Sequence, residues 1–283
     1  MLTTGITLSN RSEAFRPSDV MISSGTRRLA GVPGVAADPT AVVPRDDWRP
    51  LDGRERELLR ARPGTPLNLM LTVVGLDADS LARCQDQLLP LLAAAGRNGP
   101  DEEGGHRSAV LVEVRERILD AVLRGVGAVS TRQGAADSVV HGPGLVSTAY
   151  NYEQRTFMGL HLDNHEDHAL AERHRSLLLT VTNLGTADRW VHFVNLRAVD
   201  LMRMLADTGR EVPNTGHALK NAFVAAFPSQ PVLRVRLRPG QAYLVNTQDV
   251  LHDGATNTDG DADVSFLTAN RLSPALVGAR RTP

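Results

Sequence analysis

The sequence predicts an α+β protein that is mainly β, with helices in its first half and an antiparallel sandwich or barrel in its second. Between residues 78 and 124, apolar side chains recur at the spacing of one helix face. From about residue 139 onward, short apolar runs alternate with turn residues, as in antiparallel sheets. The length of 283 residues fits one or two domains.

The first 66 residues are predicted to differ from the rest of the chain. Seven of the 16 prolines precede residue 67, and proline both fixes the backbone and removes a hydrogen-bond donor. We therefore expect residues 1–66 to form an irregular arm or lid, interrupted by one short helix at about 52–62. Residues 67–283 are expected to form a single domain.

Within that domain the elements follow in order. A short buried strand is predicted at 67–75, and Asp77 and Ser80 supply N-cap chemistry for a helix at 78–95. A loop at 96–106 separates it from a second helix at about 108–124. We expect both helices to brace the outside of a barrel at about 139–275, which contains one further helix at 197–205.

One strand of this barrel shows which side chains face water. The sequence VLRVRLRPG alternates strictly, so that arginines share one face and leucines and valine the other. This pattern predicts a strand with one solvated and one buried face. The first face carries Val232, Arg234, Arg236 and Arg238, and the second carries Leu233, Val235 and Leu237.

Composition excludes several classes of function. The formal net charge is −1, which disfavours general attraction to nucleic acid or to an anionic membrane. Cys84 is the only cysteine, so an intrachain disulfide and a thiolate cluster are excluded, and its apolar setting predicts a core residue. Neither a signal-peptide pattern nor an apolar run of the roughly 20 residues that cross a bilayer is visible. We expect a soluble cytoplasmic protein.

Three residues have the pattern of a metal site. His161 and Asp163 lie two positions apart at the predicted end of a strand, so their side chains share one face. His252 lies at the end of a later strand that begins after the Pro239-Gly240 turn. Two histidines and one carboxylate on one face, with the opposite positions open, are typical of non-haem Fe(II) oxygen chemistry.

The His-x-Asp motif, the long interval and the later strand ending in His252 resemble the Fe(II)/2-oxoglutarate-dependent dioxygenases, and more narrowly the phytanoyl-CoA-hydroxylase-like branch. The resemblance covers about residues 139–275. It implies a double-stranded β-helix, a jelly-roll or cupin-like barrel that holds the metal at its mouth. It also implies Fe(II) as cofactor, 2-oxoglutarate and O2 as cosubstrates, and succinate and CO2 as products.

The sequence does not match the motif with which this family binds the distal carboxylate of 2-oxoglutarate. Many members have an Arg-x-Ser pattern about ten residues after the second histidine; Ser265 fits the serine, but Asp263 occupies the arginine position. Arg271 shares the parity of Ser265 along the strand, and we expect it to bind the carboxylate. Arg175 or Arg155 are the alternatives. Binding of the carboxylate by a lysine, as in some branches of the family, is excluded because Lys220, in a different context, is the only lysine.

Other polar residues near the motif have less specific signals. The segment after Asp163 is strongly polar, so we expect His165, Asp167 and His168 to be solvated loop residues. Asn183 is a candidate for hydrogen bonding the cosubstrate, although asparagine before Leu-Gly is also typical of a turn. Five residues on neighbouring strands are candidates to line the substrate pocket: Tyr150, Tyr152, Arg155, Trp190 and His192.

Asp163 also bears on the reaction type. Related halogenases have a small residue at this position, so its presence favours hydroxylation, desaturation or ring formation. The expected substrate is a small molecule, amino-acid-like or a secondary metabolite; nucleic acid and membrane are not expected partners, and the oligomeric state is not predicted. Two other classes stay open: a cupin-type metalloenzyme that uses the same triad without 2-oxoglutarate, and a non-catalytic barrel that only binds.

Overall fold

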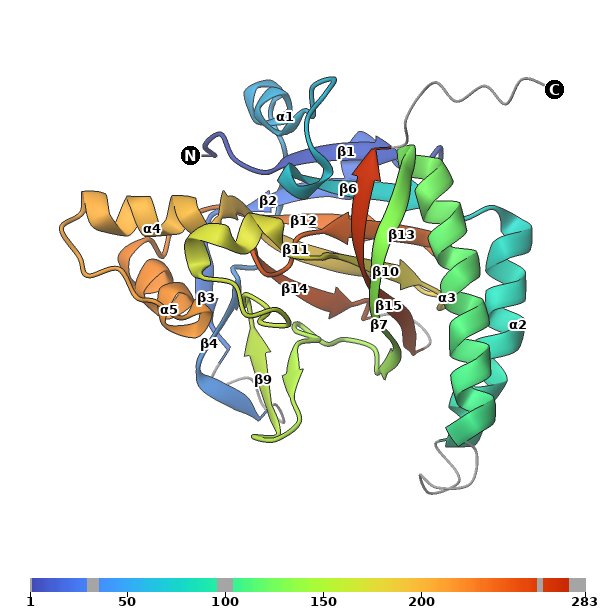
Figure 1. The fold of residues 1–283 in the computed structure, drawn as a ribbon. Coiled ribbons are helices and arrows are strands. Elements are labelled where there is room, and N and C mark those ends of the chain that lie inside the picture. The colour runs from blue at the N-terminus through green and yellow to red at the C-terminus, as the bar shows by residue number, and fades with distance from the viewer. Residues whose placement is uncertain (1, 30–35, 96–103, 259–261, 275–283) are drawn as a thin grey trace.

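The computed structural model describes residues 2–29, 36–95, 104–258 and 262–274, and its centre is a pair of facing β-sheets (Figure 1). The six-stranded sheet has the order β1 (Thr7–Arg11), β6 (Met70–Gly75), β13 (Gln241–Val245), β10 (Leu178–Asn183), β15 (Asp263–Pro274), β7 (Ala128–His141). The five-stranded sheet has the order β14 (Val250–Thr256), β11 (Arg189–Arg197), β12 (Val232–Leu237), β2 (Val20–Ser23), β5 (Arg49–Pro50).

The chain passes repeatedly from one sheet to the other. Strands β10, β13 and β15 lie in the six-stranded sheet, whereas β11, β12 and β14 lie in the five-stranded sheet. The inner faces pack into one core, in which Val181 and Tyr243 of the first sheet meet Phe193 and Val235 of the second. This arrangement confirms the predicted fold class, a mainly β α+β protein with a double-stranded β-helix.

A smaller sheet lies beside the barrel. It has the order β3 (Thr26–Arg28), β4 (Ala37–Pro44), β9 (Thr156–Gly159), β8 (Tyr150–Asn151). Its β9 leads directly to the predicted metal-binding motif. An isolated antiparallel bridge between His161 and His252 ties this motif to β14.

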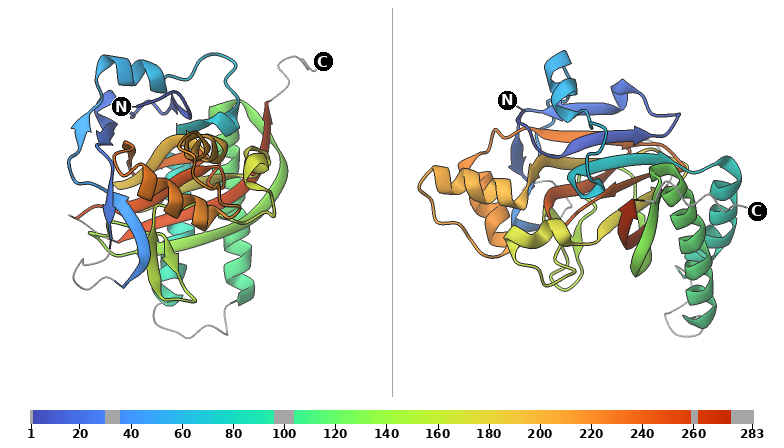
Figure 2. Two further views of the ribbon diagram at one scale, coloured as in Figure 1. Left: turned by 90° about the vertical axis from the view of Figure 1, so that its left-hand side faces the viewer. Right: turned by 45° about the horizontal axis from the view of Figure 1, so that its top comes forward.

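Two long helices cover the outer face of the six-stranded sheet. Helices α2 (Ala78–Ala95) and α3 (Gly104–Val126) lie at one end of the molecule, as Figures 1 and 2 show. Cys84 and Ile118 from these helices pack against Leu244 and Phe266 of the sheet. The predicted bracing role is confirmed. Cys84 is fully buried, and burial raises the pKa of its thiol to about 11, so it is an unreactive core residue.

A second pair of helices lies at the other end of the molecule (Figure 1). Helix α4 (Ala198–Asp207) was predicted, whereas α5 (Gly216–Ala226) was not. The two pack together through Leu201, Leu205, Leu219 and Phe223. In the part of the chain that the structure describes, no helix is long and apolar enough to span a bilayer.

The first 66 residues contain more regular structure than expected. Besides α1 (Gly53–Leu59), which Asp52 caps, they form five strands. Strand β1 pairs in parallel with β6, and β2 pairs with β12, so this segment contributes to both main sheets. The expectation of an irregular segment was wrong for these strands, because their pairing depends on distant partners. The division into an arm and a domain stays a prediction. Three short 3-10 helices complete the fold: η1 (Pro17–Asp19), η2 (Leu67–Leu69) and η3 (Leu170–Arg175).

Candidate metal centre

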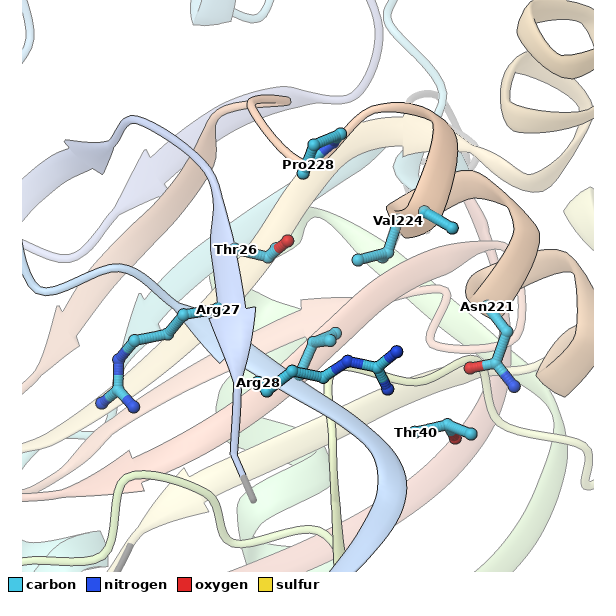
Figure 3. A pocket seen from close by; sticks show the side chains of 9 residues that line it. Thr26, Arg27, Arg28, Thr40, Asn221, Val224 and Pro228 are labelled. Atoms are coloured by element: carbon cyan, nitrogen blue, oxygen red, sulfur yellow. The ribbon is translucent and has the colours of Figure 1, made fainter. Parts of the chain in front are cut away.

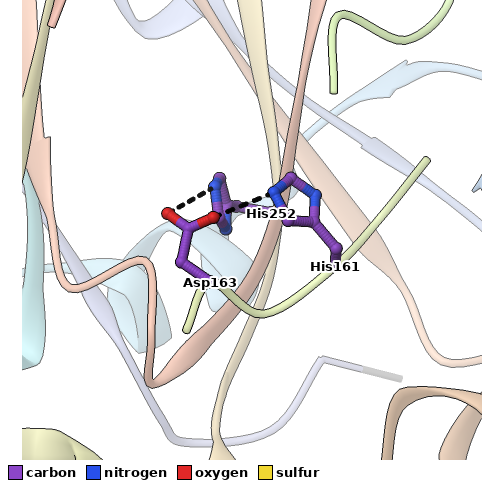
Figure 4. Close-up of side chains that lie close together, drawn as sticks. All are labelled: His161, Asp163 and His252. Carbon is purple, nitrogen blue, oxygen red and sulfur yellow. Dashed lines mark hydrogen bonds and ion pairs between the residues drawn. The ribbon is translucent and has the colours of Figure 1, made fainter. Parts of the chain in front are cut away.

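The three predicted ligands come together where the segment after β9 meets β14 (Figure 4). One ligand atom from each of His161, Asp163 and His252 lies within 4.8 Å of the other two. The Nε2 atoms of His161 and His252 are 3.2 Å and 3.7 Å from the two carboxylate oxygens of Asp163. Bonds of about 2.1 Å to an octahedral ion place neighbouring ligand atoms about 3 Å apart. The separations therefore suit one metal ion bound on one face.

Backbone carbonyls fix the orientation of both imidazoles. The Nδ1 of His161 donates to the carbonyl of Gly159 at 2.9 Å, and the Nδ1 of His252 donates to the carbonyl of Val250 at 3.2 Å. A histidine that binds a metal through Nε2 carries its proton on Nδ1, and the bonds to these carbonyls match that form. Ligating histidines in metalloproteins are usually held in this way.

The charges of the triad depend on its burial. Burial opposes ionisation of Asp163, but positive charge at His252 and hydrogen bonds from His161 and His165 hold the pKa of this carboxyl well below its usual range. Burial, together with repulsion from His161, lowers the pKa of His252 to about 4. At neutral pH the site therefore contains an anionic carboxylate and a neutral His252. Burial opposes protonation of His161, but its hydrogen bond to Asp163 and the charge of that carboxylate raise its pKa, so a divalent cation would bind in competition with a proton at this imidazole.

Arg173 holds the backbone next to the carboxylate ligand. The residue is 4% exposed, and its guanidinium donates to the carbonyls of Asp163, at 2.9 Å, and Gln248, at 3.1 Å. A third bond reaches Oδ1 of Asn164 at 2.8 Å. Arg173 thereby joins the segment after β9 to the segment before β14. Sequence reasoning missed this residue because its partners are mostly backbone atoms.

His165 lies closer to the site than expected. Its Nε2 is 3.2 Å from Oδ2 of Asp163, although its side chain is 62% exposed. The imidazole therefore contacts the carboxylate from the solvent side. The predicted solvated loop residue agrees with the exposure of His165, but the prediction did not include its contact with Asp163.

Deeper in the barrel, Arg189 is an arginine that the sequence did not single out. It is 3% exposed, and its Nη1 lies 3.6 Å from Oδ2 of Asp263. Within the described residues, its Nε and Nη1 have no hydrogen-bond partner. A Cβ at Gly254 would lie 2.9 Å from its Nη2, so the guanidinium crosses the barrel beside the strand that carries His252. This is a buried cation whose hydrogen-bonding capacity is largely unused.

The arginines named from the sequence lie elsewhere. Arg271 is 40% exposed, and its Nη2 is 3.6 Å from Oε1 of Glu166; it lines a surface cavity with Arg175 and His174, at the opposite end of β15 from Asp263. Arg175 is 61% exposed and pairs with Glu172. Arg155 is exposed in the turn between β8 and β9, where it has a φ of 54°.

Two further cosubstrate candidates are buried and bonded within the protein. The hydroxyl of Ser265 donates to Oδ2 of Asp263 at 3.1 Å. The Asn183 amide donates to the carbonyls of Ala187 and Leu237 and accepts from the N–H of Gly185. The contacts of Asn183 hold the turn between β10 and β11, which is the structural alternative considered for this residue.

The substrate-pocket candidates fall into two groups. Tyr150 and Tyr152 form an edge-to-face pair with ring centroids 5.1 Å apart, and Tyr152 is 76% exposed. Trp190 and His192 lie on β11 at positions that alternate with Phe193, whose partner across the strands is His252. Side chains alternate between faces, so Trp190 and His192 point to the outer face of this sheet, away from the triad.

Comparison with known proteins finds similarity to solved structures only. No protein-family model and no curated protein sequence matches the chain. The chain is similar to AviO1 from Streptomyces viridochromogenes Tue57, with 14% identity and a TM-score of 0.44 over 72% of this chain and 90% of that one. It is also similar to the Kdo hydroxylase KdoO, a non-haem Fe(II) alphaketoglutarate-dependent dioxygenase solved with alphaketoglutarate and Fe(III), with 12% identity, a TM-score of 0.44, and 71% and 79% of the chains covered.

A third similar structure is SnoN, a non-haem alpha ketoglutarate-dependent epimerase from nogalamycin biosynthesis. The identity is 17% and the TM-score 0.43, with 71% of this chain and 77% of that chain covered. Because the identities and scores are low, we base the proposed function on the residues of this chain.

Proposed function

We propose that the protein is a non-haem Fe(II)/2-oxoglutarate-dependent oxygenase. The observation that carries the proposal is the cluster of His161, Asp163 and His252, whose ligand atoms point at one another with both imidazoles oriented by backbone carbonyls. The open side of such a triad can accept a chelating cosubstrate and O2.

The residues present fit an iron ion. The donor set is two imidazole nitrogens and one carboxylate, and none of the three side chains is more than 17% exposed. Arg173 binds the backbone carbonyl of Asp163 and so holds the segment that carries the carboxylate. Bound iron would supply the activation of O2 that oxidises the substrate while 2-oxoglutarate is converted to succinate and CO2.

The residues present also fit a dicarboxylate cosubstrate. Arg189 offers two unused guanidinium donors inside the barrel, and a planar guanidinium suits a carboxylate in two parallel hydrogen bonds. Tyr243 is buried within electrostatic range of both Asp163 and Arg189, and burial raises the pKa of its phenol. We therefore propose that Arg189 binds the distal carboxylate of 2-oxoglutarate, with Arg271 as the alternative. Ser265 stays a proposed neighbour of that carboxylate.

The substrate is proposed to be a small molecule, amino-acid-like or a secondary metabolite, that is hydroxylated, desaturated or cyclised. Asp163 occupies the third ligand position, which supports these outcomes over halogenation. Arg234 and Arg236 would support a carboxylated substrate only if their side chains faced the interior of the barrel. Both lie on the outer face of β12 instead, because Leu233 and Val235 are the buried positions. Tyr150, Tyr152 and Arg155 remain proposed contacts at the mouth.

Anaerobic addition of Fe(II) and then 2-oxoglutarate tests the proposal. The expected result is a visible charge-transfer absorption band that needs both additions and is abolished in His161→Ala. His174→Ala, which changes a partly exposed histidine outside the triad, serves as the matched control and should keep the band. A different result would contradict the proposal: wild type binds iron and His161→Ala does not, but 2-oxoglutarate produces no band in wild type. That result would favour the cupin-type alternative.

A further inference from the structure

The two tryptophans of the chain lie together at a pocket on the outer face of the five-stranded sheet. Trp190 and His192 project from β11, Arg234 lies beside His192 on β12, and Trp48 covers them from the segment after β4. The cavity has a volume of about 360 Å³, and residues 144–146 and 255–258 form another wall. We call it the Trp–Arg pocket. Because it lies on the face opposite His252, it is separate from the metal centre.

Arg234 is held rigidly in this pocket. Its guanidinium carbon lies 4.4 Å from the ring centroid of Trp48 and 4.6 Å from that of Trp190. Cation–π contacts of this kind fix the plane of a guanidinium and shield its faces from water. Nε is buried and Nη2 contacts Met21, so Nη1 is the nitrogen left for hydrogen bonds in that plane.

Arg234 lacks the partner that its neighbours have. On the same face of β12, Arg236 pairs with Asp188, and just beyond the strand Arg238 pairs with Asp19. Among the described residues, Arg234 hydrogen-bonds only to the thioether of Met21, a weak acceptor, at 3.0 Å from Nη2, while Asp46 attracts it electrostatically. Its Nε is buried without a partner among the described residues. A half-buried cation in this state is costly unless a ligand or water completes its bonding.

Two further polar groups belong to the pocket. Arg27 of β3 lines both this pocket and the neighbouring cavity, whereas Arg28 lines only the neighbouring one. Figure 3 shows the Arg27 side chain pointing away from Arg28, which points toward Asn221 and Thr40. His192 is 6% exposed, and its Nδ1 is buried without a partner among the described residues. Asp46, at the rim, is the only carboxylate among the lining residues, so the two arginines give the pocket a net positive charge.

We propose that the Trp–Arg pocket is a second binding site, which takes a small organic anion through its carboxylate or phosphate group. The oxyanion binds Nη1 of Arg234, with Arg27 as the second cation. The remainder of the ligand lies against the indole rings, because flat apolar surface stacks well on tryptophan. Arginine is suited to this role because its planar donor fork matches both oxyanions. The site does not depend on the function proposed for the metal centre.

Intrinsic fluorescence tests this site directly, because both tryptophans of the chain line the pocket. Metal-free full-length protein is titrated with benzoate, phenyl phosphate and inorganic phosphate, and with neutral benzamide as control. The expected result is a saturable change in emission with at least one anion and none with benzamide. Saturation by benzoate alone assigns a carboxylate, and saturation by either phosphate assigns a phosphate. No saturation by any anion up to about 10 mM overturns the proposal.

Variants locate the binding. Arg234→Met, which keeps an unbranched side chain between the indoles, should weaken anion binding at least about tenfold. Arg27→Met should also weaken it, whereas Arg28→Met, one residue along β3 and facing the other cavity, should leave it unchanged. Equal affinity in folded Arg234→Met and wild type overturns the site. If Arg234→Met fails to fold, Arg27→Met decides, since its side chain is exposed: unchanged binding in that variant overturns the proposal.

Discussion

Replacing Arg189 by methionine is expected to weaken 2-oxoglutarate binding far more than the same change at Arg271. The Arg189 guanidinium is 3% exposed and has two unused donors, so a carboxylate bound there would make unscreened, charge-assisted bonds. Losing such a contact costs about 1.5–3 kcal/mol, or about 10- to 150-fold in affinity. Arg271 is 40% exposed and already faces Glu166 at 3.6 Å. Its contribution should be about 0–1 kcal/mol, less than about fivefold.

The assay is anaerobic calorimetry of 2-oxoglutarate binding to the Mn(II)-loaded protein. Because Arg189→Met leaves Asp263 buried without its counter-charge, the informative variant is the double change Arg189→Met with Asp263→Asn, compared with Asp263→Asn alone. Arg271→Met is the matched control at the other end of β15. Wild-type affinity in the double variant, with lost affinity in Arg271→Met, would refute the assignment of Arg189 and return the role to Arg271.

Three other changes have expected outcomes. Arg173→Met frees the carbonyl of Asp163 and should lower metal affinity about 10- to 100-fold in a Mn(II) titration; unchanged affinity would show that the loop holds itself. Burial lowers the pKa of Lys220 from 10.5 to about 8, so the folded state favours the neutral amine. The free energy of unfolding should therefore rise between pH 8 and 10.5 in wild type relative to Lys220→Met, and parallel pH profiles from urea titrations would contradict this. Phe193→Ala removes a fully buried ring and should cost about 3–5 kcal/mol in urea unfolding; a loss below about 1 kcal/mol would indicate that the core refills the space.

The metal ligands could be predicted because their signal is local. His161 and Asp163 share a face by strand alternation alone, and His252 ends a strand whose start is marked by a turn. Arg189 could not be found in this way. Its position near the triad depends on β11 facing β15 across the barrel, which no short stretch of sequence encodes. One signal was present: Asp263 stands where the dioxygenases that the motif resembles carry an arginine, and a buried carboxylate requires a cation from elsewhere in the barrel.

The first part of the chain was predicted less well, for a related reason. Strands β1 and β2 are short, and Pro17 lies between them, so their local sequence favours irregular structure. Their pairing with β6 and β12 supplies the missing stabilisation. Helix α5 was missed because its buried face, Gly216, Leu219, Lys220 and Phe223, includes a glycine and a lysine, which weaken the apolar periodicity.

An anaerobic crystal structure with Fe(II) and 2-oxoglutarate tests the central claim most directly. The result we predict is iron bound by the Nε2 atoms of His161 and His252 and by the carboxylate of Asp163, with the distal carboxylate of 2-oxoglutarate at Arg189. Iron bound elsewhere, or 2-oxoglutarate absent from the barrel at saturating concentration, would contradict the claim.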